Sequence, residues 1–244
     1  MPVQTPLILL QHVFKSYYEG TENEVHALDN ISFCVQEGEF VSIIGQSGSG
    51  KSTLMNCIGC LDVPTHGSYQ FRGQEIEHCR DSALSRIRNR EIGFIFQGFN
   101  LIPGLSALEN VEMPLIYRGI SRGERQRRAE DALCMVGLEH RMDHRPGQLS
   151  GGQQQRVAIA RAIAAEPSLL LADEPTGNLD SHAGSEIVDL LHGLHRRGKT
   201  ILLITHDQLV AQAAERTVEI CDGKIVDDHL TQKNGPFLSN TTSQ

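Results

Sequence analysis

The sequence predicts an α/β domain with a mainly parallel sheet, an N-terminal antiparallel β layer and an inserted helical subdomain. Three observations lead to this fold class. The run FVSIIG at 40–45 is apolar without polar alternation, which is typical of a buried parallel strand. After residue 150, helical and strand patterns alternate, which indicates a parallel sheet covered on both faces. Residues 98–150 hold helical patterns and no convincing strand, so we expect them to be inserted in a single domain spanning 1–230.

The N-terminal part of the chain is expected to supply the antiparallel layer and the first strands and helices of the core. Its elements are predicted as strands at LILLQHV, HALDNISFCV and EIGFIFQ, an edge hairpin strand at GSYQFRG (67–73), and helices at KSTLMNCIGCL and DSALSRIRNR.

The C-terminal part alternates between the two kinds of element and completes the parallel sheet. Helices are predicted at QQQRVAIARAIAA, GSEIVDLLHGLHRR and QLVAQAAERT (208–217), and strands at SLLLAD, KTILLITHD and VEICDGKIV (218–226). Residues 231–244 are polar and are expected to form a loose tail.

Composition and charge exclude several classes of protein. Apolar residues make up 39% of the 244 residues, which is enough for a packed core. The net charge of −8 argues against nucleic acid as the main partner, because such binding needs positive charge facing phosphates. No apolar run approaches the about 20 residues that cross a bilayer, and the start lacks the charged region of a secretion signal. We therefore expect a cytosolic chain, unless a partner holds it at a membrane.

One CxxC pair, Cys57 and Cys60, lies within the apolar helix KSTLMNCIGCL. A zinc site would need further ligands at suitable spacing, and the sequence has no second CxxC. A redox role stays open, but the apolar surroundings favour buried structural thiols.

GQSGSGKST, at residues 45–53, matches the P-loop pattern GxxxxGK[ST] between a buried strand and a helix. Glycines let the backbone curl so that several N–H groups point at phosphate oxygens. Lys51 is expected to reach the β- and γ-phosphates of ATP, and the Ser52 hydroxyl to bind Mg²⁺. The expected nucleotide contacts of this loop are Gly45, Ser47, Gly48, Ser49, Gly50, Lys51, Ser52 and Thr53.

Two carboxylates, Asp173 and Glu174, follow the apolar strand SLLLAD at its carboxyl end, where ligands of α/β sheets bind. Alone, such a pair is equally typical of an ordinary strand end. Together with the P-loop, it predicts that Asp173 holds Mg²⁺ through water and that Glu174 polarises the attacking water.

A second glycine-rich helix start occurs at LSGGQ, residues 149–153. Ser150 and Gln153 have the spacing of a capping box, and Gly151 and Gly152 leave backbone N–H groups open to an anion. Because one ATP has one γ-phosphate, which Lys51 already binds, we expect this loop to serve the ATP of a second copy of the chain. The alternative is an ordinary glycine-rich helix cap.

The sequence resembles the ATP-binding-cassette (ABC) ATPases over residues 5–228, and LSGGQ matches the signature motif of that family. The resemblance implies a P-loop NTPase core of the RecA-like type and roles for several further residues. These are Gln97 as the glutamine loop that contacts Mg²⁺ and the membrane partner, Asp180 in the loop between monomers, His206 as the switch histidine at the γ-phosphate, and Tyr17, with Tyr18 as the alternative, stacked on adenine.

The resemblance further implies hydrolysis of ATP to ADP and phosphate by a head-to-tail dimer with two shared sites. In segments such as LADEPTGNLDSHAG, the sequence resembles the subgroup of macrolide-exporter and lipoprotein-release ATPases. The implied partner is then a separate permease, with the chain bound peripherally at the inner face of the membrane. Regulation of a cell-wall hydrolase through a membrane partner, and a P-loop small-molecule kinase, remain the alternatives.

Residues 99–117 are more apolar than a solvated loop, and they are the expected docking surface for the membrane partner. The alternative is that these side chains pack the helical subdomain's own core. The basic stretch RGERQRRAED is interpreted as a solvated helix face. The apolar side chains concerned are Phe99, Leu101, Ile102, Leu105 and Leu108.

Overall fold

A computed structural model describes residues 5–231 of the chain. The polar tail expected at 231–244 lies outside the described residues except for Thr231, whose backbone N–H donates to the carbonyl of Glu215 at 2.9 Å.

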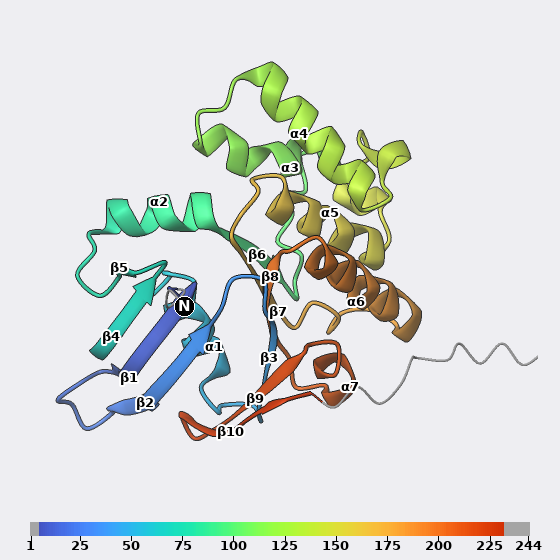
Figure 1. Ribbon diagram of the computed structural model, residues 1–244. Coiled ribbons are helices and arrows are strands. Elements are labelled where there is room, and N and C mark those ends of the chain that lie inside the picture. The colour runs from blue at the N-terminus through green and yellow to red at the C-terminus, as the bar shows by residue number, and fades with distance from the viewer. Residues whose placement is uncertain (1–4, 232–244) are drawn as a thin grey trace, which may run out of the picture.

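A six-stranded sheet forms the centre of the molecule (Figure 1). Its strands are β3 (Phe40–Ile44), β6 (Ile92–Phe96), β7 (Leu169–Asp173), β8 (Thr200–Ile204), β9 (Arg216–Cys221) and β10 (Lys224–Leu230). The strand order is β10-β9-β3-β8-β7-β6, and every pair is parallel except β9 with β10. The predicted mainly parallel sheet is thereby confirmed.

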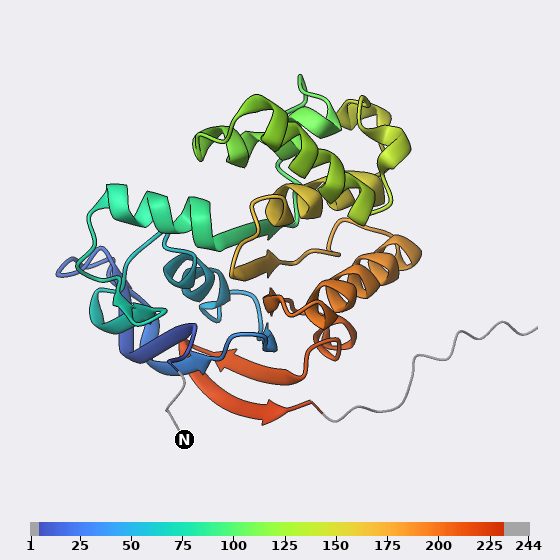
Figure 2. The same ribbon diagram turned by 45° about the horizontal axis from the view of Figure 1, so that its top comes forward.

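Both faces of this sheet are covered, which explains why its strands are apolar without alternation. Leu171 of β7 packs into the cluster beside α1 (Lys51–Ile58), whereas its neighbours Leu170 and Ala172 pack into a second cluster beside α6 (Ser181–Arg196). Figure 2 shows the two helices on opposite sides of the sheet. Burial on both faces therefore holds the strand ends, which carry the polar site, in fixed positions.

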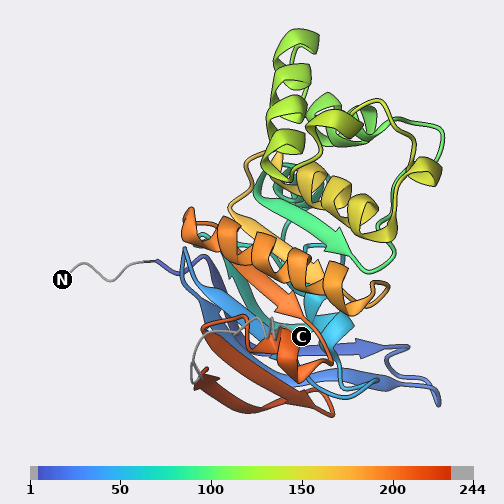
Figure 3. The ribbon, with the colours of Figure 1, turned by 90° about the vertical axis from the view of Figure 1, so that its right-hand side faces the viewer.

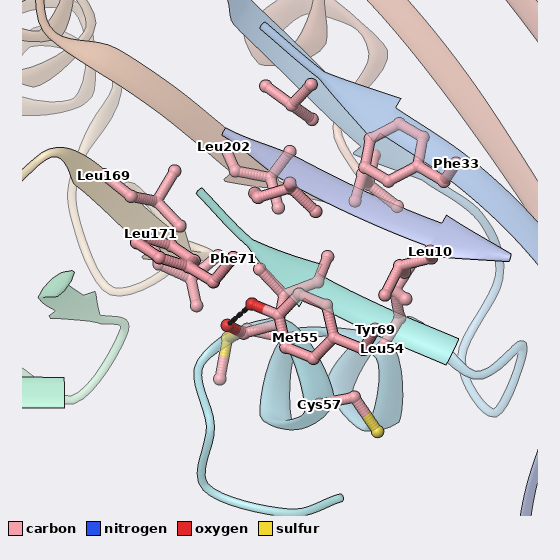
Figure 4. Close-up of a cluster of buried hydrophobic side chains, with 14 of the residues drawn as sticks. Leu10, Phe33, Leu54, Met55, Cys57, Tyr69, Phe71, Leu169, Leu171 and Leu202 are labelled. Atoms are coloured by element: carbon pink, nitrogen blue, oxygen red, sulfur yellow. Dashed lines mark hydrogen bonds between the residues drawn. The ribbon is translucent and has the colours of Figure 1, made fainter. Parts of the chain in front are cut away.

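A smaller antiparallel sheet packs on the α1 side of the core. It consists of β1 (Ile8–Tyr17), β2 (Val25–Val35), β4 (His66–Phe71) and β5 (Gln74–Glu75), in the order β2-β1-β4-β5. The expected edge position of GSYQFRG is wrong, because β4 lies between β1 and the two-residue β5. Figure 4 shows Tyr69 of β4 beside Leu54 and Met55 of α1, and its hydroxyl donates to the Ile58 carbonyl at 2.7 Å.

The helical subdomain stands at one end of the sheet (Figure 3). It contains α3 (Ala107–Tyr117), α4 (Arg122–Met135) and the short 3₁₀ turns Glu139–Arg141 and Pro146–Gln148, and it packs on α5 (Gly151–Ile163). The helix α2 (Asp81–Glu91) precedes β6. In the basic stretch of α4, Arg122, Gln126 and Arg127 are exposed, whereas Ala129 is buried and Arg125 is half-buried. Arg127 and Arg128 bind Glu124. The interpretation as a solvated helix face holds for the exposed residues.

The predicted helix at 208–217 is wrong beyond its first turn. α7 covers only Gln208–Ala211, and Arg216 already pairs with Val41 in the parallel ladder of β9 with β3. The single strand predicted at 218–226 is a hairpin, with Asp222 and Gly223 at φ 48° and 75°. Asp-Gly is a favoured pair for such a two-residue turn, so sheet pairing outweighs the helical pattern here.

The two cysteines of the CxxC pair are buried at the end of α1 and beyond it. Burial raises the pKa of the Cys57 thiol to about 12 and that of the Cys60 thiol to about 11. Both thiols therefore stay protonated at neutral pH, and the interpretation as buried structural cysteines is confirmed.

Candidate functional site

A cleft of about 1030 Å³ lies at the carboxyl ends of the parallel strands. Its lining joins segments that are far apart in the sequence: the β1 end, the P-loop, the residue after β6, the β7 end and the residues after β8. The predicted site residues that line it are Tyr17, Gly45, Ser47, Gly48, Gly50, Lys51, Ser52, Thr53, Gln97, Asp173, Glu174 and His206. Ser49 is buried instead and does not line the cleft.

The P-loop connects β3 to α1 and needs glycine at particular positions. Gly50 precedes α1 at φ 104°, and a Cβ there would stand 2.6 Å from the Ala27 carbonyl oxygen. A Cβ on Gly45 would stand 2.2 Å from the Ile220 carbonyl oxygen. No side chain caps the start of α1, so its first N–H groups are available to an anion at the positive end of the helix dipole.

Lys51 is nearly buried at the start of α1, and its Nζ donates to the carbonyls of Gly45 and Gln46, both at 2.7 Å. Burial lowers the pKa of Lys51, while Glu174 and Asp173 oppose that shift. Burial, reinforced by the charge of Glu174, raises the pKa of Asp173, and Lys51 counteracts it. The cleft therefore places one ammonium group among two carboxylates in a partly desolvated space.

Glu174 and His206 contact each other directly. The Nδ1 of His206 lies 2.7 Å from Oε1 of Glu174, and the backbone N–H of His206 donates to the same oxygen at 3.0 Å. Glu174 adopts φ 46°, a left-handed conformation that is costly for a side-chain-bearing residue. These contacts hold the carboxylate at the cleft although the backbone is strained.

Gln97 follows β6 and is held by a residue that the sequence analysis did not single out. Its Nε2 donates to Oδ1 of Asn178 at 3.2 Å, and Nδ2 of Asn178 donates to the Gln97 carbonyl at 3.1 Å. A Cβ on Gly177 would stand 2.6 Å from Nε2 of Gln97. Gln97 and Asn178 are 81 positions apart, so no local pattern could have indicated this pair.

Tyr17 lines the cleft, whereas Tyr18 is 73% exposed and is not among the lining residues. The Tyr17 hydroxyl donates to Oδ2 of Asp62 at 3.2 Å. Lys15 donates to Oδ1 of the same carboxylate at 2.6 Å, and its Nζ lies 5.1 Å from the centre of the Tyr17 ring. An ion pair thus holds the aromatic ring at the edge of the cleft.

The second glycine-rich loop lies apart from this cleft, because none of the residues 150–153 lines it. The predicted capping box is confirmed: Ser150 Oγ accepts from the Gln153 N–H at 3.3 Å, and Gln153 Oε1 accepts from the Ser150 N–H at 3.0 Å. Asp180 is also outside the cleft and caps α6 by accepting from the Ala183 N–H at 2.9 Å.

A polar residue that the sequence analysis overlooked is Gln155, which is fully buried in α5. Its Nε2 donates to the carbonyl of Pro175 at 2.7 Å and lies 3.4 Å from that of Phe96. A signal existed: Gln155 stands four residues before Ile159 on the apolar face of a helix, where an amide needs an explanation.

A glycine loop opening a helix, a buried lysine and two carboxylates at strand ends, all meeting in one cleft, define a P-loop nucleotide-binding protein. In the part of the chain that the structure describes, no helix is long and apolar enough to cross a bilayer.

Comparisons with known proteins narrow this class. The family model described as ABC transporter matches residues 28–177. An uncharacterized ABC transporter ATP-binding protein of Thermotoga maritima is 54% identical over 88% of this chain and 92% of its own length. The cassette MJ0796, solved as a dimer in a post-hydrolysis state with ADP and Pi, is 48% identical, with a TM-score of 0.84 over 92% of this chain and 99% of that one. The chain therefore belongs to the ABC transporter family.

Longer relatives match as well. The macrolide export ATP-binding/permease protein MacB of Hyphomonas neptunium is 52% identical over 91% of this chain. The chain spans only 34% of the length of that relative.

Proposed function

We propose that the cleft binds ATP with Mg²⁺ and hydrolyses it by in-line attack of water. Glu174 orients and polarises the water, and its contact with His206 at 2.7 Å is the observation that carries this assignment. Lys51 and the uncapped start of α1 stabilise the charge on the transferring phosphoryl group. His206 adds a hydrogen bond at the same phosphate, and Tyr17 supports the adenine ring.

The donor set at the cleft fits Mg²⁺, which prefers oxygen ligands and retains several waters. Ser52 supplies a hydroxyl, Gln97 an amide oxygen, and Asp173 a carboxylate that acts through water. When bound, the ion would neutralise charge on the β- and γ-phosphates.

A direct test of the reaction is to follow phosphate from ATP and Mg²⁺ with the purified chain. Release of free phosphate, abolished by EDTA, supports the proposal. Transfer of the phosphoryl group to an added metabolite, without free phosphate, would support a kinase and overturn it.

We further propose that two copies pair head to tail, so that residues 150–153 of one copy complete the ATP site of the other. In support, this loop lies outside its own cleft. The start of α5 has no acidic residue in its first turn, and it offers backbone N–H groups at the positive end of a helix dipole. It also lacks a lysine, so it suits the far side of a phosphate that Lys51 of the partner copy already binds. Asp180 would lie at the contact between the two copies.

We propose that ATP hydrolysis by this chain drives a separate membrane permease, with the chain bound peripherally at the inner face of the membrane. The similarity to proteins named macrolide export and pyoverdine export ATP-binding/permease proteins supports an export or mechanotransmission role. Their remaining length, which this chain does not match, would correspond to the permease.

The docking surface expected at 99–117 needs a narrower definition. Leu101 and Leu108 pack against the buried cluster that joins the helical subdomain to the α6 side of the sheet, which favours the alternative of core packing for these two side chains. Ile102 is 43% exposed and Tyr117 is 76% exposed. Tyr117 lines a groove of about 470 Å³ between α2, β6, α3 and α5, together with Phe94, Phe96 and Pro114. We propose that an amphipathic segment of the permease docks in this groove.

This docking can be tested by purifying the chain from membranes with its partner. Tyr117→Ser should lose the partner, because it removes a large ring from the groove. Leu209→Ser, at an exposed position on α7 outside the groove, should retain it. Equal retention by both variants would rule out the groove as the docking site.

A further inference from the structure

Gln155 connects the helix that starts at the signature loop to two catalytic segments. It lies in α5 five residues after Ser150, which is about 7.5 Å along the helix axis. Its amide nitrogen reaches the carbonyls of Pro175 and Phe96. Pro175 directly follows Glu174, and Phe96 directly precedes Gln97. One buried side chain therefore touches the backbone beside both the proposed base and the proposed Mg²⁺ ligand.

This amide is not explained by stability alone. Among the described residues, Oε1 of Gln155 is one of two buried side-chain polar atoms without a hydrogen-bond partner. Leaving such an atom unpaired costs about 1–3 kcal/mol, and the other buried side chains of α5 are apolar. A methionine would fill the same space without an unpaired amide oxygen, but it would also remove the donor to the two carbonyls. The contribution of the amide therefore lies in these two carbonyl contacts.

A second residue of the same helix holds the segment that follows Gln97. Arg161 donates to the carbonyls of Phe99 at 2.8 Å and Asn100 at 2.5 Å. Both acceptors adopt left-handed conformations, at φ 58° and 50°, which are strained for side-chain-bearing residues. The loop from 96 to 100 is thus fixed at three carbonyls by side chains of α5.

We infer that Gln155 is a positioning residue: it makes the placement of Gln97 and Glu174 in one copy depend on whether the signature loop of that same copy is engaged with the partner's ATP. A helical segment of about one and a half turns is stiff, so a shift at Ser150 displaces Gln155 and, with it, the carbonyls of Phe96 and Pro175. The two ATP sites of a dimer are thereby coupled through α5. This inference rests on the proposed composite site.

Mixed dimers test the inference, because they separate the two sites. Each mixed dimer contains one Gln155→Met substitution and one Glu174→Gln substitution, and the latter leaves a single working ATP site. Each copy carries a different affinity tag, so that tandem purification isolates the mixed dimer. In the first arrangement, Gln155→Met lies in the copy with the intact Glu174. In the second, both substitutions lie in one copy, so the working Glu174 faces a signature loop from the Gln155→Met copy.

Single-turnover hydrolysis is compared with a mixed dimer that carries Glu174→Gln alone. The first arrangement should be about tenfold slower, the effect of losing roughly one positioning hydrogen bond. The second should stay within about twofold of the reference. Because both contain the same substitutions, a loss of folding stability would slow them equally. Gln154→Met is the matched control, since Gln154 directly precedes Gln155 in the helix and its side chain donates to the Leu149 carbonyl instead. This variant should hydrolyse ATP at nearly the reference rate in both arrangements.

Three results would overturn the inference: equal slowing in both arrangements, slowing in the second arrangement alone, or no slowing in the first. Failure to obtain any ATP-dependent mixed dimer would be a different outcome. It would overturn the composite site itself, and the inference with it.

Discussion

The chain has two glycine-rich loops that start helices, and they differ in what surrounds them. The P-loop at 45–53 has an uncapped helix start, a buried lysine and two carboxylates within the same cleft. The signature loop at 150–153 starts a helix that its own capping box closes in part, and no charged side chain stands in the first turn. The first loop has the groups to bind a nucleotide by itself. The second can only add donors to a phosphate held elsewhere.

This difference teaches that a helix start is not by itself a complete phosphate site. Partial charge at the end of a helix contributes about 0.3–1 kcal/mol at exposed positions, which is too little to hold a nucleotide alone. At the P-loop, the positive charge of Lys51 and the buried surroundings increase the free energy that phosphate binding gains. The contrast leads to four predictions, from the largest expected effect to the smallest.

Replacing Glu174 should have the largest effect, because it should abolish most of the hydrolysis while ATP binding is retained. We expect Glu174→Gln to lower the rate of phosphate release by about 10²- to 10⁴-fold, the contribution typical of a general base. ATP should still bind and a persistent dimer should form, which light scattering can measure. A monomer under saturating ATP and Mg²⁺ would contradict the role of the signature loop.

Replacing Lys51 tests whether the P-loop binds nucleotide without help. Lys51→Ala should weaken ATP binding by about 10- to 100-fold, because hydrogen bonds to charged groups contribute about 1.5–3 kcal/mol. Titration calorimetry measures the affinity, with Lys224→Ala as the control for loss of a surface lysine that pairs with Asp29. Unchanged affinity would remove Lys51 from the phosphate site.

The two neighbouring tyrosines test the adenine end of the same cleft. Tyr17→Ala should weaken ATP binding by about tenfold, since stacking on a base contributes about 1–3 kcal/mol. Tyr17→Phe, which keeps the ring, should bind nearly as well as the native chain. Tyr18→Ala serves as the control because Tyr18 lies outside the cleft; a larger loss there than at Tyr17 would reverse the assignment.

The signature loop should show the smallest effect, and only in the dimer. Ser150→Ala removes the cap, which lowers the free energy of unfolding by about 1 kcal/mol. In the Glu174→Gln background it should weaken the ATP-bound dimer by up to about tenfold, a typical value for one hydrogen bond. Nucleotide affinity of the monomer should not change. A matching loss in the monomer would show that the two loops share one cleft.

Most of the fold could be predicted from short-range patterns, and the failures have physical causes. Apolar runs such as FVSIIG indicated buried strands correctly, because both faces of the central sheet are covered. The helix expected at 208–217 failed because residues from Arg216 onward extend the sheet beside β3. Leu101 and Leu108 were expected at a docking surface, yet they pack against a buried cluster of helices and strands that are distant in sequence.

In the candidate site, too, local patterns predicted some features and long-range packing decided the others. Motif spacing indicated the residues that line the cleft, because each motif sits where a strand ends and a helix or loop begins. The partners that hold them, Asn178 for Gln97 and the Lys15–Asp62 pair for Tyr17, have no local pattern. They meet only after strands distant in the chain pair with one another.

The sequence by itself determined the chemistry: which side chains can bind phosphate, hold a metal ion or polarise water, and at which strand ends they lie. These properties are local, because a residue's donors and charge and the pattern of its neighbours are written in a short segment. Only the tertiary structure decided that the signature loop lies outside the cleft of its own chain and that Gln155 reaches two catalytic segments. Such long-range placement depends on how helices and strands pack around a shared core, which no single segment of the chain specifies.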